Sequence, residues 1–434
     1  MSKIELKPYK GARDFYPEDK AFQKWMFNKW REVVESFGYV EYDAPILEPT
    51  DLFLLKGNQE IIDSQTYTFL DRGDRSVTVR TEMTPSISRM VASKRQELSY
   101  PLRWYSIPNL WRYERMQKGR LREFWQLNVD MFGDSSEFAE LEMLQIIDGI
   151  FQKFQAKRTS YTIKINSRLL VNQLLNDLGM TEIKSVEIIR LLDKLSKMSA
   201  EEFATELDKL TGNSDSSKKI VQFMSAKTID ELTDNLIKLP SAALINKILV
   251  DLSNLGIRNV VYDPTLMRGF DYYTDIVFEV FDNDPENNRA ILGGGRYDGL
   301  VGQMGVEPVP TIGFAIGDVV FADFLRTHKL VRKINLSIEA TMIIREVDSI
   351  NGALAAARDL REMGVKLSVD TTGRKIEKQL KSALKSGVTY IIFAGAEEIK
   401  NKLFTIKNIN SGSEEKHSLQ RIVSIIKDSR NTIS

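Results

Sequence analysis

The most informative stretch of the chain runs from residue 111 to residue 126 and reads WRYERMQKGRLREFWQ. Arg112 lies on a predicted strand, residues 110–114, and a second strand is predicted over residues 123–131. The segment between them, residues 115–120, is polar and basic. Strands on both sides of such a loop predict an antiparallel hairpin with a basic tip. An antiparallel sheet is therefore expected in the domain that holds this segment.

The chemistry of this hairpin has two interpretations. Arg112 is fixed by the sheet, and its planar guanidinium can bind a phosphate or a carboxylate bidentately. Gln126, Asn128 and Asp130 fall on one face of the returning strand because side chains alternate along a strand. These features fit a phosphate cradle. An edge hairpin with exposed charges explains the same pattern.

Positive charge is concentrated around the hairpin. Residues 89–122 contain nine basic and two acidic residues, whereas the whole chain contains 60 of each. The basic stretch fits a phosphate-binding surface, or a solvated face beside acidic groups elsewhere in the fold. The zero net charge of the whole chain gives no indication of a nucleic-acid partner.

The composition excludes several kinds of site. The chain has no cysteine, which excludes disulfides, thiolate catalysis and cysteine-ligated zinc. It has only two histidines, His328 and His417, too few and too far apart for an HExxH site or a multi-histidine metal cluster. Carboxylates, Arg, Lys, Tyr and backbone amides remain, and they suit phosphoryl and nucleotidyl transfer. No signal peptide is visible and no apolar run approaches the roughly 20 residues of a membrane span, so we expect a cytoplasmic protein without a membrane partner.

The length of 434 residues predicts two or three domains. Residues 1–165 and 259–330 mix predicted strands with helices, and we interpret them as the two parts of one α+β catalytic core. Residues 166–258 are almost entirely helical in pattern and rich in Leu, Lys, Asp and Ser, which indicates a helical insertion. In residues 336–434, short apolar strands alternate with helices, which predicts a separate C-terminal domain with a parallel α/β sheet.

Two glycine-containing segments are candidates for ligand binding. Residues 268–274 read RGFDYYT and place an arginine, an aspartate and two tyrosines beside a glycine that lets the backbone approach a ligand. Paired tyrosines are also common core residues. Residues 293–299 read GGGRYDG, which suits a flat floor under a small ligand, and a flexible turn explains the glycines nearly as well. The spacing is not that of a P-loop or a dinucleotide-binding fingerprint.

Together these segments resemble the histidyl-tRNA synthetase family, and the resemblance covers nearly the whole chain. Residues 11–17 are similar to the family's opening, residues 38–48 to class II motif 1, and residues 111–133 to motif 2. The runs RGFDYYT and GGGRYDG are similar to two signatures of histidyl enzymes. The resemblance implies a class II antiparallel-sheet catalytic domain with a helical insertion, followed by a C-terminal α/β anticodon-binding domain.

The activity that the resemblance implies is the ligation of histidine to tRNA(His) through a histidyl-adenylate. The substrates would be ATP, L-histidine and tRNA(His), with Mg²⁺ bound to the ATP. No metal site formed by side chains is predicted. A homodimer is expected, because motif 1 forms the dimer interface in this family.

The resemblance also implies roles for single residues. Arg112 and Arg268 would grip the α-phosphate and the substrate carboxylate, and would stabilise the charge that develops during catalysis. Asp130 and Tyr273 would read the two imidazole nitrogens of histidine, a ring with one donor and one acceptor. The other implied contacts are Glu82, Thr84, Gln126 and Tyr272 with histidine, Glu114 with ATP, a pocket floor of Gly293, Gly294 and Gly295, and Arg115, Gln117 and Arg120 with tRNA.

The sequence departs from the family pattern at motif 3. The family places an arginine against the ATP phosphates shortly after a Gly-Phe-Ala-x-Gly strand, which is present here at residues 313–317. The aligned position holds Val320, and Arg326 lies nearly two helical turns further on. This loss favours an alternative function, a histidine-sensing regulatory subunit of ATP phosphoribosyltransferase. The retained Arg112 and Arg268, and the C-terminal domain, favour the ligase.

Overall fold

The computed structural model describes six stretches of the chain, residues 5–54, 65–195, 198–267, 272–287, 289–332 and 338–431. The chain divides into two compact units, Met1–Asp14 with Met26–Val331, and Phe15–Trp25 with Arg332–Ser434. None of the helices in the described stretches has the length and apolar character needed to span a bilayer.

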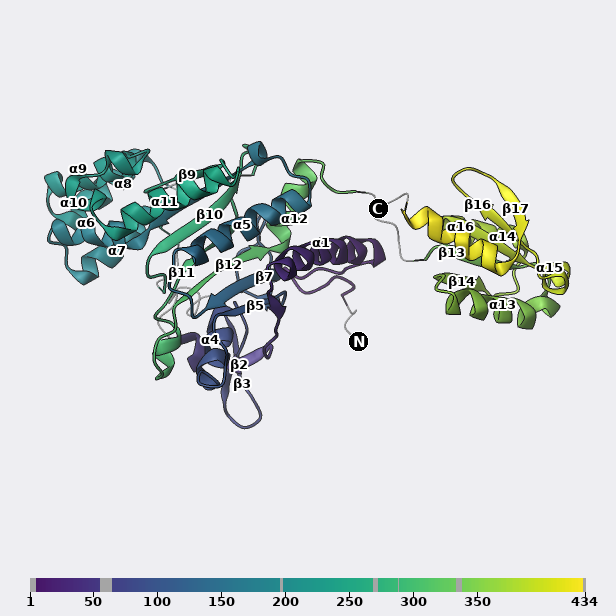
Figure 1. Cartoon of the computed structure of the whole chain (residues 1–434). Helices are drawn as coiled ribbons and strands as arrows, with labels where there is room; N and C mark the ends of the chain where they lie inside the picture. Colours follow the sequence, from purple (N-terminus) through teal and green to yellow (C-terminus); the bar gives the residue numbers. More distant parts are fainter. Residues whose placement is uncertain are drawn as a thin grey trace. The chain divides into compact units, whose positions relative to one another are not determined.

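The first unit is built on a nine-stranded sheet with the order β1-β5-β7-β12-β11-β10-β8-β9, in which β6 also pairs with β7 (Figure 1). Its strands are β1 (Val40–Glu41), β5 (Leu102–Ser106), β6 (Asn109–Trp111), β7 (Glu123–Phe132), β8 (Tyr161–Ser167), β9 (Val260–Tyr262), β10 (Ile276–Asp282), β11 (Ala290–Arg296) and β12 (Thr311–Gly317). The pairs β1·β5 and β8·β9 are parallel, and the other pairs of this sheet are antiparallel. The antiparallel-sheet α+β fold predicted from the sequence is confirmed.

One face of this sheet packs into the hydrophobic core of the unit. Register brings Val129, Phe314 and Phe278 into one row across β7, β12 and β10, and all three side chains are buried. Helices α5 (Phe138–Lys153) and α12 (Asp318–Thr327) cover this face (Figure 1). Because side chains alternate along each strand, the neighbouring rows point to the opposite face, where the candidate site lies.

The N-terminal helix α1 (Pro17–Ser36) is anchored by aromatic packing. Trp30 is fully buried, and its ring centroid lies 5.4 Å from that of Phe321 on α12. A smaller antiparallel sheet, with the order β2-β4-β3, consists of β2 (Leu47–Pro49), β3 (Tyr67–Leu70) and β4 (Ser76–Val79). The helices near it are α2 (Asp51–Leu54) and α4 (Thr84–Ser93).

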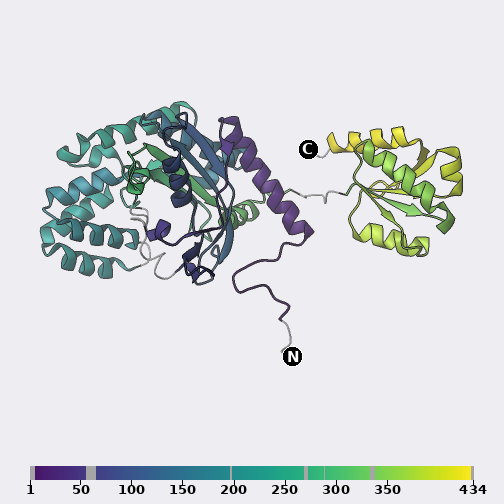
Figure 2. The ribbon, with the colours of Figure 1, turned by 90° about the horizontal axis from the view of Figure 1, so that it is seen from below.

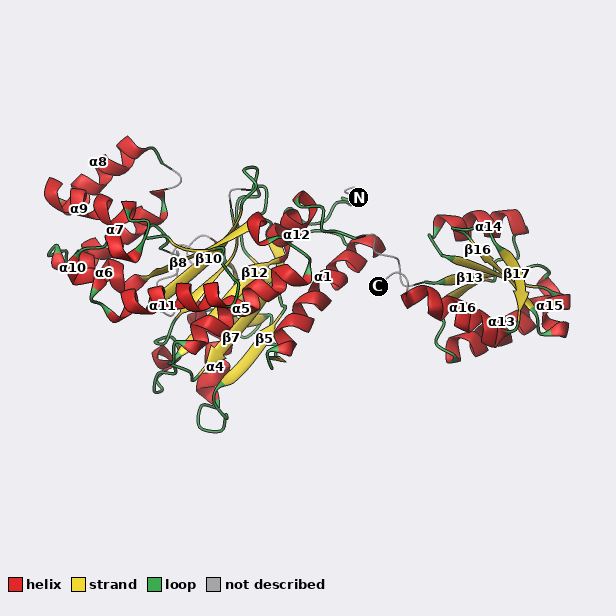
Figure 3. Cartoon of the chain, turned by 45° about the horizontal axis from the view of Figure 1, so that its top comes forward, coloured by secondary structure: helices red, strands yellow, loops and turns green. Residues whose placement is uncertain are grey.

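A group of helices is inserted in the chain between β8 and β9, which pair directly with each other, and it lies beside β8 and β10 (Figure 3). Its members are α6 (Arg168–Asp177), α7 (Glu182–Asp193), α8 (Ala200–Thr211), α9 (Ser214–Ser225), α10 (Asp234–Ile237) and α11 (Pro240–Asn254). Local sequence sets the helix ends. Ser199 and Glu202 form a reciprocal capping box at the start of α8, and Gly212 ends that helix in the left-handed conformation.

The second unit contains a five-stranded sheet with the order β14-β13-β15-β16-β17 (Figure 2). Its elements are β13 (Ala340–Ile344), α13 (Ile350–Glu362), β14 (Leu367–Asp370), α14 (Ile376–Lys385), β15 (Tyr390–Ala394), α15 (Ala396–Asn401), β16 (Phe404–Asn408), β17 (Glu414–His417) and α16 (Leu419–Asn431). Helices α13 and α16 pack on one face of the sheet, and α14 packs on the other.

The sheet of the second unit is mixed, whereas the sequence pattern predicted a parallel sheet. Strand β13 is parallel to β14 and β15, but β16 is antiparallel to both β15 and β17. Residues 395–403 join β15 to β16, and so short a connection cannot carry the chain back for a parallel pairing, which needs about a dozen residues. The prediction failed because it considered the alternation of elements and not the length of this connection.

Candidate active site

The polar face of the large sheet has a floor of small residues. Register pairs Asp130 of β7 with Gly313 of β12, and Gly313 with Gly295 of β11. A Cβ at position 313 would lie 2.3 Å from Oδ1 of Asp130, and one at position 295 would lie 2.9 Å from the ring of Tyr273. The carboxylate of Asp130 and the ring of Tyr273 therefore lie over neighbouring floor positions.

The three successive glycines of β11 are divided between the two faces of the sheet. Gly293 and Gly295 share the face of Asp130, because register and alternation place them there. Gly294 lies in the apolar row, where a Cβ would come 2.6 Å from Cβ of Phe314. Gly294 thus allows close packing behind the sheet and does not face the floor.

Two further polar residues of β7 extend the site. Gln126 and Asn128 pair in register with Gly317 and Ala315 of β12, so the positions beside them are small. Asn128 is buried, and its Nδ2 donates a hydrogen bond of 3.1 Å to the carbonyl of Gln126. The regular strand β7 confirms that Gln126, Asn128 and Asp130 share one face.

Asp130 is a buried carboxyl group with a specific partner. Only 4% of the residue is exposed, and it accepts a hydrogen bond from the hydroxyl of Tyr297. Burial raises the pKa of Asp130 to about 7, and the hydrogen bond from Tyr297 opposes this rise. Burial also raises the pKa of Tyr297 well above its ordinary value, as does the neighbouring carboxylate. Both the charged and the neutral form of Asp130 are therefore accessible near neutral pH.

Tyr297 had no predicted role, although it belongs to the run GGGRYDG. It packs with Tyr272 and Tyr273, with ring centroids 5.5 Å and 6.3 Å away. The hydroxyl of Tyr272 donates to Oε2 of Glu82 at 3.5 Å. The aromatic cluster thus connects the carboxylate predicted to bind the substrate ammonium group with the carboxylate predicted to bind its ring.

Thr84 and Glu82 lie where the chain enters α4. Thr84 is the first residue of this helix and is half-buried, and Pro85 follows it within the first turn. The carbonyl of Thr81, one residue before Glu82, accepts a hydrogen bond of 3.0 Å from Nε of Arg112. The motif 2 arginine is therefore fixed to the segment that carries Glu82.

The predicted strand over residues 110–114 is wrong in its bounds: β6 ends at Trp111, so Arg112 follows the strand directly. Its guanidinium is nevertheless held on several sides. Its backbone amide donates to the carbonyl of Arg122 at 2.8 Å, which closes the hairpin. The guanidinium carbon lies 5.5 Å from the ring centroid of Phe124, and Nη1 lies 4.0 Å from Oε1 of Glu114. Since the fork is oriented without being fully buried, it remains able to meet a phosphate.

The basic residues around the hairpin fall into two groups, those paired within the fold and those exposed on the loop. Arg89 and Arg103 form ion pairs of 2.8 Å with acidic residues elsewhere in the fold, and Arg122 lies 3.8 Å from the ring centroid of Tyr113. These three arginines support the structure. The loop residues predicted to contact tRNA, Arg115, Gln117 and Arg120, are exposed.

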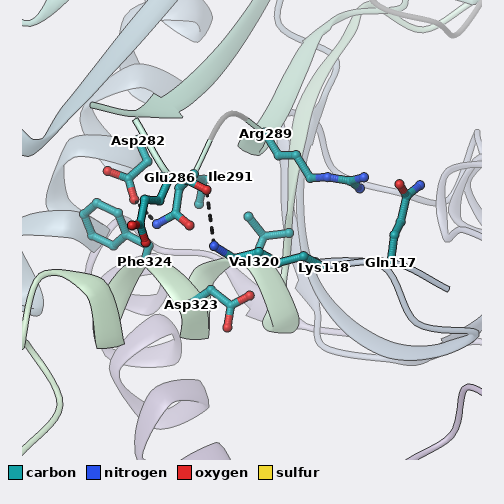
Figure 4. Close-up of a pocket in the computed structure, with 11 residues that line it drawn as sticks. Gln117, Lys118, Asp282, Glu286, Arg289, Ile291, Val320, Asp323 and Phe324 are labelled. Atoms are coloured by element: carbon teal, nitrogen blue, oxygen red, sulfur yellow. Dashed lines mark hydrogen bonds between the residues drawn. The ribbon is translucent and has the colours of Figure 1, made fainter. Parts of the chain in front are cut away.

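The tip of this loop closes over a cavity of about 260 Å³ (Figure 4). Nζ of Lys118 donates to the carbonyl of Glu286 at 3.2 Å, which joins the loop to the turn between β10 and β11. Val320, the residue in the motif 3 position, lines the same cavity. Two residues earlier, the buried Asp318 forms an ion pair of 2.7 Å with Arg13 and accepts the backbone amide of Trp125 at 2.9 Å.

The arginine of the run GGGRYDG has a structural contact. Nε and Nη2 of Arg296 lie 2.5 Å and 2.8 Å from the two carboxylate oxygens of Glu140 on α5, and both side chains are buried. This paired fork fixes the end of β11 to the helix behind the sheet. Arg268 lies outside the described residues, so its predicted contact with substrate stays a prediction. Among the residues that the structure does describe, no group of three acidic or histidine side chains could hold a metal ion.

Comparison with known proteins agrees with this geometry. A family model described as histidyl-tRNA synthetase matches residues 11–317, and one described as anticodon binding domain matches residues 341–429. The chain belongs to the histidyl-tRNA synthetase family. The family and the fold class predicted from the sequence are thereby confirmed.

Relatives in this family span the same length. The histidine–tRNA ligase of Leptospira biflexa serovar Patoc is 40% identical over 432 residues, 98% of each chain. That of Thermoplasma volcanium is 34% identical over 433 residues, 98% of this chain and 99% of that protein. The crystal structure of histidyl-tRNA synthetase from Nostoc sp. PCC 7120 covers 98% of this chain and 100% of its own, with a TM-score of 0.82 and 22% identity, which is a likeness of fold.

Proposed function

We propose that this chain ligates histidine to tRNA(His) in two steps, through a histidyl-adenylate. The observation that carries the proposal is the arrangement of Asp130 and Tyr273 over the floor at Gly313 and Gly295, in a chain of this family. Glycines at these two positions let the carboxylate of Asp130 and the ring of Tyr273 lie directly on the sheet. A buried carboxyl and a phenol beside it match a ring that carries one donor and one acceptor nitrogen.

In the first step the histidine carboxylate attacks the α-phosphorus of ATP, and pyrophosphate leaves. Arg112, fixed by the carbonyl of Thr81, holds the α-phosphate and stabilises the charge that develops there. Glu82, Thr84 and Gln126 hold the ammonium group of histidine. ATP enters as its magnesium complex, and the metal belongs to the substrate. Arg268 completes the site in this proposal.

In the second step the terminal ribose hydroxyl of tRNA attacks the acyl group of the adenylate. No enzyme nucleophile is needed, which agrees with a chain that lacks cysteine. The exposed loop residues Arg115, Gln117 and Arg120 would contact the acceptor stem. The second unit would bind the anticodon, since it matches the anticodon-binding family model.

A candidate RNA surface exists on the second unit. Residues 371–375 and the lysines Lys378, Lys381 and Lys385 of α14 are exposed. The buried Gln379 fixes this helix, because its amide donates to the carbonyls of Ile344 at 3.1 Å and Arg374 at 2.7 Å. We also propose a homodimer, formed through motif 1, that works in the cytoplasm.

The regulatory-subunit function is weaker. Its support is the valine at position 320, and the comparisons do not favour it over the ligase. The arginine of motif 2 and a domain that matches an anticodon-binding family both remain in this chain.

Histidine-dependent exchange of labelled pyrophosphate into ATP, without tRNA, tests the first step. Wild type should show exchange that requires histidine, and Arg112→Ala should lower it about 100-fold or more, as loss of a donor at a developing negative charge does. Arg326→Ala is the matched control, because this side chain is 61% exposed and pairs with Asp323 on the same helix. Measurable histidine binding without any exchange in wild type would support the regulatory subunit instead.

A further inference from the structure

Two arginines of the motif 2 hairpin and a third from a distant part of the chain surround one carboxylate. Glu114 lies 4.0 Å from Arg112 and 3.2 Å from Arg120. Arg289, the residue before β11, is close enough to Glu114 and Arg120 for both charges to act on it. One carboxylate cannot neutralise three guanidinium groups, so the group retains positive charge that suits a polyphosphate.

Arg289 is the member of this group without a partner. Within the described part of the chain it forms neither an ion pair nor a hydrogen bond. Partial burial lowers the pKa of Arg289, and so does the neighbouring charge of Arg120. An anion that bound here would supply the missing countercharge.

Arg289 also lies beside the position at which the motif 3 arginine is absent. A Cβ built on Gly119 would be 3.2 Å from Cγ2 of Val320 and 3.5 Å from Cδ of Arg289. Both side chains line the cavity under the motif 2 loop, and Figure 4 shows Arg289 directed toward Gln117, on the side away from Asp282. The side chains of Arg289 and Val320 thus both lie beside Gly119 in the same cavity.

The two ends of the cavity differ in charge, which limits where an anion can bind. Asp282 is at the end away from Arg289 (Figure 4). Its carboxylate forms hydrogen bonds of 2.7 Å with His328 and 2.8 Å with Asn287. Glu286 and Asp323 line that end as well. Carboxylates repel phosphate, so the favourable location is the end where Arg289 approaches the arginines of motif 2.

We propose that Arg289 takes the place of the missing motif 3 arginine and binds the β- and γ-phosphates of ATP. This inference rests on the proposed function, and it assigns a substrate-binding residue to the same site. The chain has moved the guanidinium from the helix after β12 to the residue before β11. The valine at position 320 then leaves room for Arg289 to reach the phosphates.

The test compares Michaelis constants in the pyrophosphate-exchange assay with full-length protein. Arg289→Ala should raise the KM for ATP about 10- to 100-fold, the loss expected for a charge-assisted hydrogen bond, and leave the KM for histidine nearly unchanged. Adding Val320→Arg to that variant should recover most of the loss, because the cavity of about 260 Å³ beside position 320 has room for the longer side chain. Arg326→Ala is again the matched control and should behave as wild type.

Inhibition by AMP locates the contact along the nucleotide. AMP lacks the β- and γ-phosphates, so its inhibition constant should be the same in wild type and in Arg289→Ala. Equal loss of ATP and AMP affinity would place Arg289 on the adenosine and overturn the proposal. An unchanged KM for ATP with slower charging of tRNA would place it on RNA and also overturn it.

Failure of this inference is distinguishable from failure of the proposed function. Wild type that shows no histidine-dependent exchange contradicts the function itself. Wild-type exchange with a KM for ATP that Arg289→Ala does not alter contradicts only the role of Arg289. A thermal melt of each variant separates a lost contact from misfolding, and recovery by Val320→Arg can occur only in a folded protein.

Discussion

The buried carboxyl group of Asp130 makes the stability of the catalytic unit depend on pH. Its pKa in the folded chain is about 7, compared with an ordinary value of 3.8, because burial disfavours the charged form. A folded-state pKa above the unfolded one stabilises the fold at low pH. That contribution is fully present below pH 3.8 and is lost as the pH rises through 7.

Asp130→Asn removes this titration and keeps an acceptor for the hydroxyl of Tyr297. Between pH 5 and pH 8, wild type should lose about 2–3 kcal/mol of unfolding free energy relative to the variant, the amount that about two pH units of linkage give, because the loss ends near the folded-state pKa of about 7. The sign follows from the raised pKa. The unfolding free energy of the variant should therefore increase relative to that of wild type as the pH rises.

Urea denaturation followed by tryptophan fluorescence measures this difference. Four of the five tryptophans, those from Trp30 to Trp125, belong to the first unit, so most of the signal reports on the catalytic unit, and Trp25 belongs to the second unit. Asp134→Asn is the control. Burial alone would raise the pKa of Asp134, but hydrogen bonds from Ser136 and the charge of Arg296 lower it overall. The difference between this control and wild type should thus stay constant from pH 5 to pH 8. Parallel profiles for wild type and Asp130→Asn would refute the reasoning.

Two further substitutions test the floor and its support. Gly313→Ala places a Cβ 2.3 Å from Oδ1 of Asp130, so the carboxylate must move. The KM for histidine in pyrophosphate exchange should rise about tenfold or more, and the protein should lose about 1–3 kcal/mol of unfolding free energy. An unchanged KM for histidine would show that Asp130 is not part of the histidine pocket. Arg296→Met leaves Glu140 buried without its partner, and urea denaturation should show a loss of about 3–5 kcal/mol. Adding Glu140→Gln should recover part of that loss, and no recovery would mean that packing, not charge, holds this contact.

The elements with a strong local pattern could be predicted from the sequence. The hairpin around residues 111–132 was predicted because predicted strands flank a polar, basic loop and polar residues alternate along the returning strand. The C-terminal domain was recognised because short apolar strands alternate with helices there. The prediction of a parallel sheet there was wrong, because the direction of β16 depends on the length of its connection to β15 and not on composition.

Contacts between distant residues could not be predicted from pattern alone. Arg296 and Glu140 are 156 positions apart, and Arg13 and Asp318 are 305 apart. Gly294 lies on the opposite face of the sheet from Gly293 and Gly295. Which face each glycine occupies follows from the register of β11 against β12, which a single sequence does not specify.

Some features of the candidate site could be predicted from the local sequence, whereas others depend on contacts between residues that are distant in the chain. Tyr297 was available in the quoted run GGGRYDG, but its hydroxyl meets Asp130 only because β7 and β11 flank the same strand. The sequence marked Val320 as the position of a lost arginine. It gave no indication that Arg289, 31 positions earlier and on a different element, lies beside it.

Transfer of labelled histidine to tRNA(His) by the purified full-length chain tests the central claim most directly. With ATP and magnesium present, wild type should charge tRNA(His) with histidine and with no other amino acid, and Arg112→Ala should charge it very slowly. Histidine that binds without ever reaching tRNA would contradict the account and identify a histidine sensor on the same fold.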